Sequence, residues 1–457
     1  MSAIAAPRPI KRLLVANRGE IAVRIQRACR ELGIQTVQVY SEADRESLAV
    51  QMADVAVCIG PARASESYLR GERIVEAALA LRADAIHPGY GFLSERAAFA
   101  QLCEREGVTF VGPSAQAIAT MGDKARARAV AREAGVPVTP GSAGPVADAR
   151  AALDVAATLG YPVLLKAVAG GGGRGMRVVE RAADLTGHFQ NAAQEAQAAF
   201  GDGAIYVEKY LSQIRHVEIQ VLSDGVNVLN LGERDCSLQR RNQKLVEEGP
   251  APNLPQALRA SMGAAAVRLC RHVGYRSAGT VECIVDSARE AFYFMEMNTR
   301  IQVEHPVTEC TTGIDIVKQQ IRIASGEPLS MRQEDVQVQG RAIECRINAE
   351  DPRNGFAPSP GVVSELHWPG GPGVRVDSHL YRGYRIPPNY DSLIAKLICH
   401  GRDRDEALAR MRGALAELRI EGVHTTTAFL ASLIDSEAFQ RGAVHTRFVE
   451  SFIGSSA

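Results

Sequence analysis

The sequence predicts a mixed α/β and α+β protein of three parts: an N-terminal domain with a doubly wound parallel sheet, a small middle domain, and a C-terminal domain rich in antiparallel strands. Strand-like runs alternate with amphipathic helices up to about residue 112, which is the pattern of a parallel sheet. A loop with five glycines follows a strand-like run that ends near residue 168. From residue 215 onward, long alternating runs are separated by hairpin-turn residues, as in antiparallel sheets. A chain of 457 residues is too long for one hydrophobic core, so several domains are expected.

The composition argues against several function classes. Basic and acidic residues both number 52, so the net charge is zero and no global field favours nucleic acid or an anionic membrane. No apolar run approaches the roughly 18 residues of a membrane-spanning helix, and no signal-peptide core precedes the first strand. The nine cysteines are scattered without a CxxC pair, which is typical of reduced thiols and argues against a structural zinc site. We therefore expect a cytoplasmic protein that binds neither nucleic acid nor membranes.

Lysine is rare, with only seven lysines among the 52 basic residues. Because lysine is a compact point charge and arginine a wide planar fork, a lysine in this background can mark a position where arginine does not fit. Four lysines lie in the glycine-rich and charged segments described below: Lys124, Lys166, Lys209 and Lys244. The other three are expected to be ordinary surface residues: Lys11, Lys318 and Lys396.

The N-terminal domain is expected to contain five strands, with amphipathic helices between them, at residues 12–17, 34–41, 55–60, 83–88 and 108–113. The turn after the first strand, NRGE, has one glycine, whereas a dinucleotide fingerprint needs three, so a nicotinamide cofactor is not expected. The segment HPGYGFLSE (87–95) follows a strand, and loops at the carboxyl ends of strands bind ligands in open α/β sheets. A tight turn without a ligand explains this segment equally well.

The middle of the chain begins with one expected helical stretch at about 115–135 and a Pro/Gly/Ser-rich linker at 136–145. The glycine loop then follows a strand that carries Lys166. It formally matches GxGxxG, but Met176 stands where a Walker loop needs lysine, and MRVVE reads as a strand where a Rossmann loop opens a helix. The pattern predicts a strand–loop–strand hairpin whose backbone amides approach phosphate, with a plain flexible loop as the alternative.

The segment YFMEMNTRIQVEHPVTE (293–309) is expected to be a long strand with one polar and one apolar face. The apolar face, expected to pack on the core, carries Met295, Met297, Thr299, Ile301 and Val303. The polar face carries Glu296, Asn298, Arg300, Gln302 and Glu304. Carboxylate and amide oxygens are the ligands that Mg²⁺ prefers, and Glu282 in an apolar run is a candidate second carboxylate ligand. Arg300 would hold a small oxyanion and Glu304 would act as a general base, although a solvated sheet face remains the alternative.

Three further segments carry chemistry of the same kind, but each taken alone is more typical of an ion-paired surface. RHVEIQV places His216, Glu218 and Gln220 on one strand face, and the charged segment 233–248 contains Lys244. RAIECRIN offers Glu344 and Arg346 on alternating positions.

These motifs together resemble the biotin carboxylases of the ATP-grasp superfamily. The resemblance covers nearly the whole chain and rests on ANRGEIA (16–22), HPGYGFLSE, MGDK (121–124), GGGGRGM, EKY (208–210), RHVEIQV, ERDCS, QK (243–244), EMNTRIQVEHPVTE and ECRINAED (344–351). It implies an ATP-grasp fold divided into an N-terminal domain at 8–121, a helical linker at 122–137, a mobile lid at 138–211 and a catalytic β-rich domain at 212–455.

The resemblance implies a role for each matching residue. ATP phosphates would be bound by Lys124, Lys166, Gly172 and Gly173, and the adenosine by Glu208, Lys209, Tyr210, Leu211, His216 and Gln239. The Mg²⁺ or Mn²⁺ ligands would be Glu282, Glu296 and Asn298. Bicarbonate would be held by Lys244, Arg300, Gln302 and Val303, with Glu304 as base, Arg346 at the biotin ureido oxygen, and Tyr90 and Gly91 along the biotin pocket. Asn242 stands where the family commonly has histidine, which leaves that ATP contact open.

The implied reaction is ATP-dependent carboxylation of biotin by bicarbonate through carboxyphosphate, giving ADP and phosphate. The sequence has no Met-Lys pair of a biotinyl motif, so biotin is expected on a separate biotin carboxyl carrier protein, with a separate carboxyltransferase subunit completing the reaction. A homodimer is implied, and acetyl-CoA carboxylase of fatty acid biosynthesis is one assignment, with another acyl-CoA, pyruvate or urea as other acceptors. Two rival interpretations are another ATP-grasp ligase that joins a carboxylate to an amine, and a non-enzymatic subunit that retains the fold.

Overall fold

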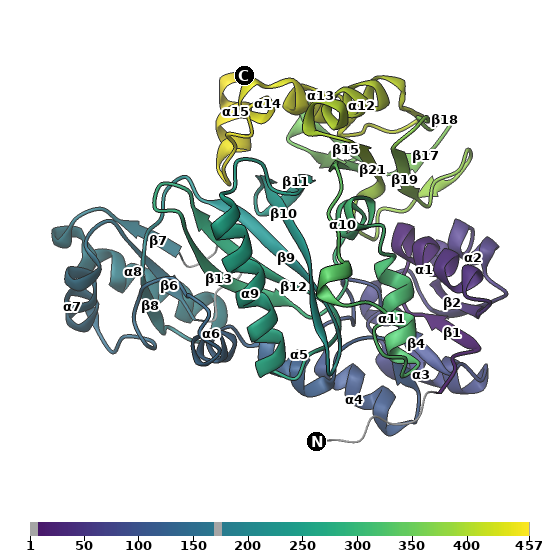
Figure 1. Cartoon of the computed structure of the whole chain (residues 1–457), viewed down its shortest axis with the longest axis horizontal. Coiled ribbons are helices and arrows are strands. Elements are labelled where there is room, and N and C mark those ends of the chain that lie inside the picture. Colours follow the sequence, from purple (N-terminus) through teal and green to yellow (C-terminus); the bar gives the residue numbers. More distant parts are fainter. Residues whose placement is uncertain (1–7, 169–175, 457) are drawn as a thin grey trace.

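The computed structural model describes residues 8–168 and 176–456, which form three sheet-based parts (Figure 1). The smallest part, which contains β6, β7 and β8, stands out to one side of the molecule, whereas the N-terminal and C-terminal parts lie against each other. In the described part of the chain, no helix is long and apolar enough to cross a membrane.

The N-terminal part is built on a fully parallel five-stranded sheet in the order β3-β2-β1-β4-β5, as the alternating pattern predicts. Its strands are β1 (Arg12–Val15), β2 (Gln35–Ser41), β3 (Val55–Gly60), β4 (Ala85–His87) and β5 (Thr109–Phe110). Its helices are α1 (Gly19–Glu31), α2 (Leu48–Met52), α3 (Gly71–Ala80) and α4 (Ala97–Arg105). Because β1 and β4 are parallel neighbours, the loops that follow them meet at one edge of the sheet.

The prediction of one helical stretch at about 115–135 is wrong in one respect. The structure has two helices there, α5 (Ala115–Gly122) and α6 (Lys124–Glu133). The break lies at Asp123, whose backbone is extended and whose side chain accepts a hydrogen bond from Arg126 N at 2.9 Å. An N-cap of this kind satisfies an otherwise unpaired amide of the first turn. It also places Lys124 at the start of a helix instead of within one.

The middle part is a three-stranded antiparallel sheet in the order β7-β6-β8, covered by two helices. Its elements are α7 (Ala149–Leu159), β6 (Val163–Ala167), β7 (Met176–Val179), α8 (Ala182–Phe200) and β8 (Ile205–Lys209). Val163, Leu165 and Val207 alternate inward and form its core with the helices. The strand after the glycine loop confirms the hairpin, since Lys166 pairs with Met176 on β7. Gly172 and Gly173 lie outside the described residues.

The C-terminal part is built on an eight-stranded antiparallel sheet in the order β13-β12-β9-β10-β11-β14-β21-β19. These strands are β9 (Arg215–Asp224), β10 (Val228–Arg240), β11 (Gln243–Gly249), β12 (Arg276–Asp286), β13 (Ala291–Asn298), β14 (Arg341–Asn348), β19 (Val374–Ser378) and β21 (Leu393–Gly401). Its helices are α9 (Gln256–His272), α10 (His305–Thr312), α11 (Ile316–Ala324), α12 (Arg404–Glu417), α13 (Thr427–Asp435), α14 (Glu437–Gln440) and α15 (Phe448–Ser456). Short strands complete it: β15 (Glu350–Asp351), β16 (Ala357–Pro358), β17 (Gly361–Val362), β18 (Glu365–His367), β20 (Arg385–Ile386) and β22 (Arg419–Glu421).

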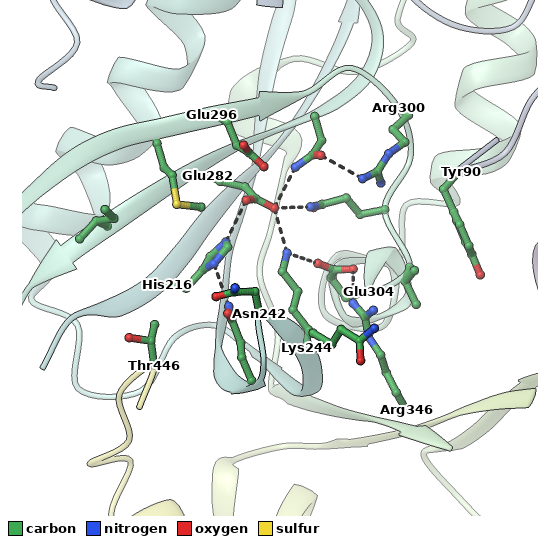
Figure 2. Close-up of a pocket in the computed structure, with 18 of the residues that line it drawn as sticks. Tyr90, His216, Asn242, Lys244, Glu282, Glu296, Arg300, Glu304, Arg346 and Thr446 are labelled. Carbon is green, nitrogen blue, oxygen red and sulfur yellow. Dashed lines mark hydrogen bonds and ion pairs between the residues drawn. The ribbon is translucent and has the colours of Figure 1, made fainter. Parts of the chain in front are cut away.

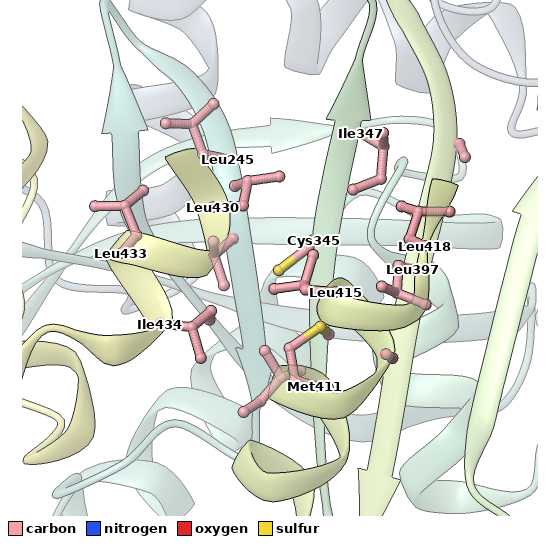
Figure 3. Close-up of a cluster of buried hydrophobic side chains, with 14 of the residues drawn as sticks. Leu245, Cys345, Ile347, Leu397, Met411, Leu415, Leu418, Leu430, Leu433 and Ile434 are labelled. Carbon is pink, nitrogen blue, oxygen red and sulfur yellow. The ribbon is translucent and has the colours of Figure 1, made fainter. Parts of the chain in front are cut away.

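Around β14 and β21, one face of this sheet is apolar and is covered by α12 and α13 (Figure 3). Met411 and Leu430 from the helices pack in one buried cluster with Cys345 of β14 and Leu397 of β21. Full burial of such a side chain stabilises the fold by roughly 1.5–3 kcal/mol. This core fixes β14 and β21, so that their other face can carry charged side chains.

Candidate active site

A cavity of about 1330 Å³ lies between the three parts and receives side chains from each of them. Every predicted site residue in the described part of the chain lines it. The residues come from the loops after β1 and β4, from the start of α6, from β6 and β8, and from one face of the large sheet.

A row of charges crosses the large sheet beneath the cavity. Glu296 of β13 pairs with Glu282 of β12, Glu282 pairs with Glu218 of β9, and Glu218 pairs with Arg234 of β10. Like charges placed directly opposite on neighbouring strands destabilise a sheet unless cations lie between them. These carboxylates therefore need counter-ions, and two cationic side chains of the protein act as such.

Arg234 is the first of these counter-ions and is completely buried. Its guanidinium donates to Glu218 Oε1 at 2.7 Å, to Gln220 Oε1 at 2.8 Å and to Gln302 Oε1 at 2.8 Å. A fork of several donors can satisfy three acceptors at once. The polar face of β9, taken from the sequence alone as typical of a surface, is thus an interior face.

Lys244 is the second counter-ion, and its ammonium contacts three carboxylates. Figure 2 shows two of these contacts, to Glu282 and Glu304. Its Nζ lies 2.7 Å from Glu218 Oε2, 2.9 Å from Glu282 Oε1 and 2.6 Å from Glu304 Oε1. Burial by itself lowers the pKa of Lys244, but these acidic neighbours raise it well above its ordinary value. The lysine is therefore charged at neutral pH and holds the three carboxylates together.

The turn that carries Asn242 sets the position of Lys244. Between β10 and β11, Arg241 has φ of 49° and Asn242 has φ of 64°, both in the left-handed region. Two-residue hairpin turns of this hand fit the twist of antiparallel strands, and asparagine tolerates the conformation well. Asn242 lines the cavity beside His216 (Figure 2).

Glu304 lies between two cations. Its Oε1 accepts from Lys244, and its Oε2 accepts from Arg346 at 2.9 Å. Burial raises the pKa of Glu304, but Lys244 and Arg346 outweigh it and leave the pKa below its ordinary value. Arg346 also donates to Glu247 Oε1 at 2.6 Å. Glu304 is therefore deprotonated and oriented before any ligand arrives.

The long strand expected through Glu304 is wrong, because β13 ends at Asn298. Residues 299–304 form a turn, and Glu304 precedes the first residue of α10. A bulge between β12 and β13 at Met295 also breaks the alternation, so that Met295 lines the cavity and Met297 is in the core. The polar side chains of 300–304 still reach the cavity, because the turn runs along its floor.

Arg300, in this turn, is held by a residue that the sequence did not single out. Its Nε donates to Glu95 Oε2 at 2.9 Å, and its Nη2 donates to Asn298 Oδ1 at 2.9 Å. Glu95 is the last residue of HPGYGFLSE, so that segment positions Arg300 as well as lining the cavity. Gly89 in the same segment has φ of 63°, and a Cβ there would lie 2.9 Å from Asn17 Nδ2.

The candidate metal ligands Glu282, Glu296 and Asn298 lie side by side on β12 and β13. Burial, and then the negative charge of Glu282, raise the pKa of Glu296. Two facing carboxylates beside an amide oxygen are a set that suits Mg²⁺, whose charge would relieve this repulsion. Asn298 Oδ1 accepts from Arg300, and its second lone pair would be the one to face a metal.

The other end of the cavity has fewer contacts between charges. Lys209 Nζ donates to Gly160 O at 2.9 Å, and Glu208 pairs with Arg128 at 2.8 Å. Among the described residues, the side-chain ammonium groups of Lys124 and Lys166 have no hydrogen-bond or ion-pair partner. Tyr210, Leu211, His216 and Gln239 complete this end.

His216 joins the two ends. Its ring is 2.9 Å from Gln239 Nε2 and 3.3 Å from Glu282 Oε2. Burial lowers the pKa of His216, but Glu282 and Glu218 raise it to about 9.

Comparison with known proteins identifies the family. The biotin carboxylase N-terminal domain matches residues 9–118, the carbamoyl-phosphate synthase L chain ATP-binding domain matches 123–332, and the biotin carboxylase C-terminal domain matches 344–451. Biotin carboxylase 1 of Bacillus subtilis (strain 168) is 57% identical over 444 residues, which cover 97% of this chain and 99% of that protein. The chain belongs to the biotin carboxylase family.

Other relatives agree with this family. Biotin carboxylase of Pseudomonas aeruginosa is 56% identical over 447 residues, which cover 97% of this chain and 99% of that protein. The crystal structure of a biotin carboxylase β,γ-ATP complex from Campylobacter jejuni has a TM-score of 0.91 at 48% identity, covering 97% of this chain and 99% of that one. The biotin carboxylase domain dimer of Hydrogenobacter thermophilus 2-oxoglutarate carboxylase, with MgADP, ADP and bicarbonate, has a TM-score of 0.89 at 52% identity, covering 97% and 98%.

As a biotin carboxylase, the chain is an ATP-grasp ligase that uses ATP, Mg²⁺ and bicarbonate to carboxylate biotin. The rival interpretations of a carboxylate–amine ligase and of a non-enzymatic subunit are set aside by this membership. The geometry also reveals residues of this biotin carboxylase that sequence reasoning missed, namely Arg234, Glu247 and Glu95, which hold the expected ones in place.

The expectation for Lys396 is wrong. This lysine is completely buried on β21, where Glu20 Oε1 lies 3.1 Å from its Nζ. Burial of a lysine depends on partners that come from distant segments, and the local sequence carries no signal of them. The only available signal was its rarity among arginines.

Proposed function

We propose that the end of the cavity around Glu304 activates bicarbonate. In this assignment, bicarbonate is bound beside Arg300, Gln302 and Val303, and Glu304 removes its proton. The resulting carbonate oxygen attacks the γ-phosphorus of ATP, the bond to the β-phosphate oxygen breaks, and carboxyphosphate and ADP form. The observation that carries this proposal is the ion-paired position of Glu304 between Lys244 and Arg346.

In the second step, carboxyphosphate breaks down to carbon dioxide and phosphate, the released phosphate takes the proton of the biotin ureido nitrogen, and that nitrogen attacks carbon dioxide to form carboxybiotin. Arg346 supplies a guanidinium next to Glu304 and would stabilise the negative oxygen of the ureido anion. Tyr90 and Gly91 line the same region and would border biotin. Arg346 is held by Glu247, so its guanidinium is oriented in advance of the reaction.

At the opposite end we assign the nucleotide. Lys124 and Lys166 would bind the ATP phosphates together with Gly172 and Gly173. The adenosine would contact the segment 208–211, His216, Gln239 and Asn242. Glu282, Glu296 and Asn298 would hold Mg²⁺, which neutralises phosphate charge when bound.

Carboxyphosphate hydrolyses in water, so the reaction needs a part of the protein that can close over the cavity and exclude water. We propose that 138–211 acts as a lid over the nucleotide, joined through 122–137 to the N-terminal domain 8–121 and closing on the catalytic domain 212–455.

We further propose a cytoplasmic homodimer that carboxylates a separate biotin carboxyl carrier protein, from which a carboxyltransferase subunit passes the carboxyl group to an acyl-CoA. Acetyl-CoA, in fatty acid biosynthesis, is the first acceptor to test. Relatives named as a pyruvate carboxylase subunit and a 2-oxoglutarate carboxylase subunit make pyruvate and 2-oxoglutarate the alternatives. Reconstitution with each carrier and transferase pair, followed by transfer of labelled bicarbonate to each acceptor, distinguishes them.

The deciding assay for the reaction is bicarbonate-dependent ATP cleavage with and without free biotin. We expect biotin to stimulate cleavage and to become carboxylated. A rate of ATP cleavage that does not change when biotin is added would contradict the proposed second step.

A further inference from the structure

Lys396 is a buried cation beside the site that none of the assignments above uses. It lies on β21 directly opposite Arg346 of β14, and it is completely buried. Its ammonium donates to Val303 O at 2.9 Å and lies 3.1 Å from Glu20 Oε1 and 3.9 Å from Asp377 Oδ2. A buried ammonium is tolerated only with such partners, so the lysine fixes whatever it contacts.

On the N-terminal side, Lys396 is linked to the loop that lines the cavity. Glu20 is in the first turn of α1, is also buried, and accepts a hydrogen bond from the hydroxyl of Tyr90. The backbone of the Tyr90 loop is held by Asn17, whose Nδ2 donates to Tyr90 O at 2.7 Å. Tyr90, Glu20 and Lys396 thus form a continuous connection from the N-terminal domain into the large sheet.

On the other side, Lys396 is linked to the turn at 299–304. This turn follows the end of β13, so no sheet ladder fixes its backbone. Three of its carbonyls are instead held by side chains: Arg300 Nη1 donates to Ile301 O at 3.2 Å, His305 Nδ1 lies 2.7 Å from Gln302 O, and Lys396 donates to Val303 O. The residues around these carbonyls, Gln302 and Glu304, are those assigned to bicarbonate.

We propose that Lys396 is a positioning residue that sets the bicarbonate pocket by holding the Val303 carbonyl, and that Glu20 and Tyr90 couple this carbonyl to the biotin side of the cavity. This inference rests on the proposed function of the same cavity. It goes further by naming a residue that touches no substrate and still determines the affinity for bicarbonate.

The test separates binding of the two substrates. In Lys396→Met, which keeps the length of the side chain without its charge, we expect the KM for bicarbonate to rise about tenfold or more, as for loss of a charged hydrogen bond. The Kd for ATP should stay within about twofold, because the lysines assigned to its phosphates lie on other elements. Steady-state kinetics and calorimetric titration with ATP provide the two values.

Loss of Lys396 also leaves Glu20 without its cation, which can destabilise the fold for a different reason. Lys396→Met combined with Glu20→Gln removes both charges, and the amide oxygen of glutamine can still accept from Tyr90. We expect this double variant to recover most of the thermal stability while its KM for bicarbonate stays raised. If the single variant does not fold, the double variant carries the same kinetic measurement.

Lys318→Met is the matched control, since Lys318 pairs with Glu31 away from the cavity and should leave the KM for bicarbonate unchanged. An unchanged KM in folded Lys396 variants, a parallel loss of ATP affinity, or recovery of both stability and KM in the double variant would each overturn the inference. Absence of biotin-stimulated cleavage in the wild-type protein would instead overturn the proposed function.

Discussion

The two ends of the cavity hold their charges differently. Around Glu304, each charged group already has partners from the protein: Lys244 contacts three carboxylates, and Arg346 contacts two. At the nucleotide end, within the described residues, Lys124 and Lys166 have no such partners. One end is neutralised by the protein itself, whereas the other is open to the charge of a ligand.

This difference fits the proposed assignment of bicarbonate to one end and ATP to the other. Bicarbonate is small and brings one negative charge, so a pocket for it must be oriented in advance, and preorganised groups need no rearrangement during the reaction. ATP brings several phosphate charges and can draw flexible lysines toward itself. Charge removal should therefore affect both chemistry and stability at the bicarbonate end, but mainly binding at the nucleotide end.

The largest effect is expected for Glu304→Gln. Glutamine keeps the shape but cannot accept a proton, so bicarbonate-dependent turnover should fall by about 10²–10⁴-fold. Glu248→Gln is a matched control, because Glu248 is a buried glutamate of the same sheet, paired with Arg404 outside the cavity. Near-normal turnover in Glu304→Gln, measured by ADP release, would remove Glu304 as the base.

Arg346→Ala should have the next largest effect. Loss of the guanidinium should lower the rate of biotin carboxylation by about 10²–10³-fold, while the Kd for ATP should stay unchanged. Stability should also fall, because Glu247 and Glu304 lose a buried cation. Arg404→Ala removes a comparable ion pair outside the cavity and should leave catalysis intact. A variant that loses ATP binding instead would place Arg346 at the nucleotide.

Lys166→Met tests the open end. The KM for ATP should rise about tenfold, since a charged contact to phosphate is lost. The melting temperature should hardly change, because no described residue depends on this lysine. Lys11→Met is the control, as Lys11 lies outside the cavity. A marked loss of stability in Lys166→Met would break the contrast between the two ends.

Much of this arrangement could be predicted from the sequence. Periodicity predicted the parallel and antiparallel sheets, because the alternation in β9 and the βαβ pattern are local properties. The resemblance of the motifs to the biotin carboxylases predicted the cavity residues before any geometry was known. The end of β13 could not be predicted, because polar and apolar residues continue to alternate through the turn after Asn298.

The buried cations Arg234 and Lys396 could not be predicted either. Their partners come from segments far apart in the chain, such as Gln302 for Arg234 and Glu20 for Lys396. Burial of a charge is a property of the tertiary structure, so a local sequence pattern predicts that these residues lie on the surface. The sequence therefore predicts which side chains line the cavity, but not which buried side chains fix their positions.

The smallest effect concerns pH and Glu247, which lies behind Arg346. Burial raises the pKa of Glu247 from 4.5 to about 7, although Arg346 opposes this. The folded protein then keeps a proton that the unfolded chain releases, so this group stabilises the fold at low pH and its contribution is lost as pH rises from about 4.5 to about 7. Glu304, Lys244 and Glu344 also face this pair and share in its titration.

Glu247→Gln should remove this contribution. The melting temperature of the wild-type protein should fall more steeply than that of the variant between pH 5 and pH 7.5, by roughly 1–3 °C over the range. Glu233→Gln, at a buried glutamate of β10 that pairs with Arg259 outside the cavity, keeps the Glu247 titration and should retain the wild-type difference between the two pH values. Parallel pH profiles for Glu247→Gln and wild type would show that Arg346 keeps Glu247 ionised, and the bicarbonate end would then hold one more fixed negative charge than the raised pKa of Glu247 indicates.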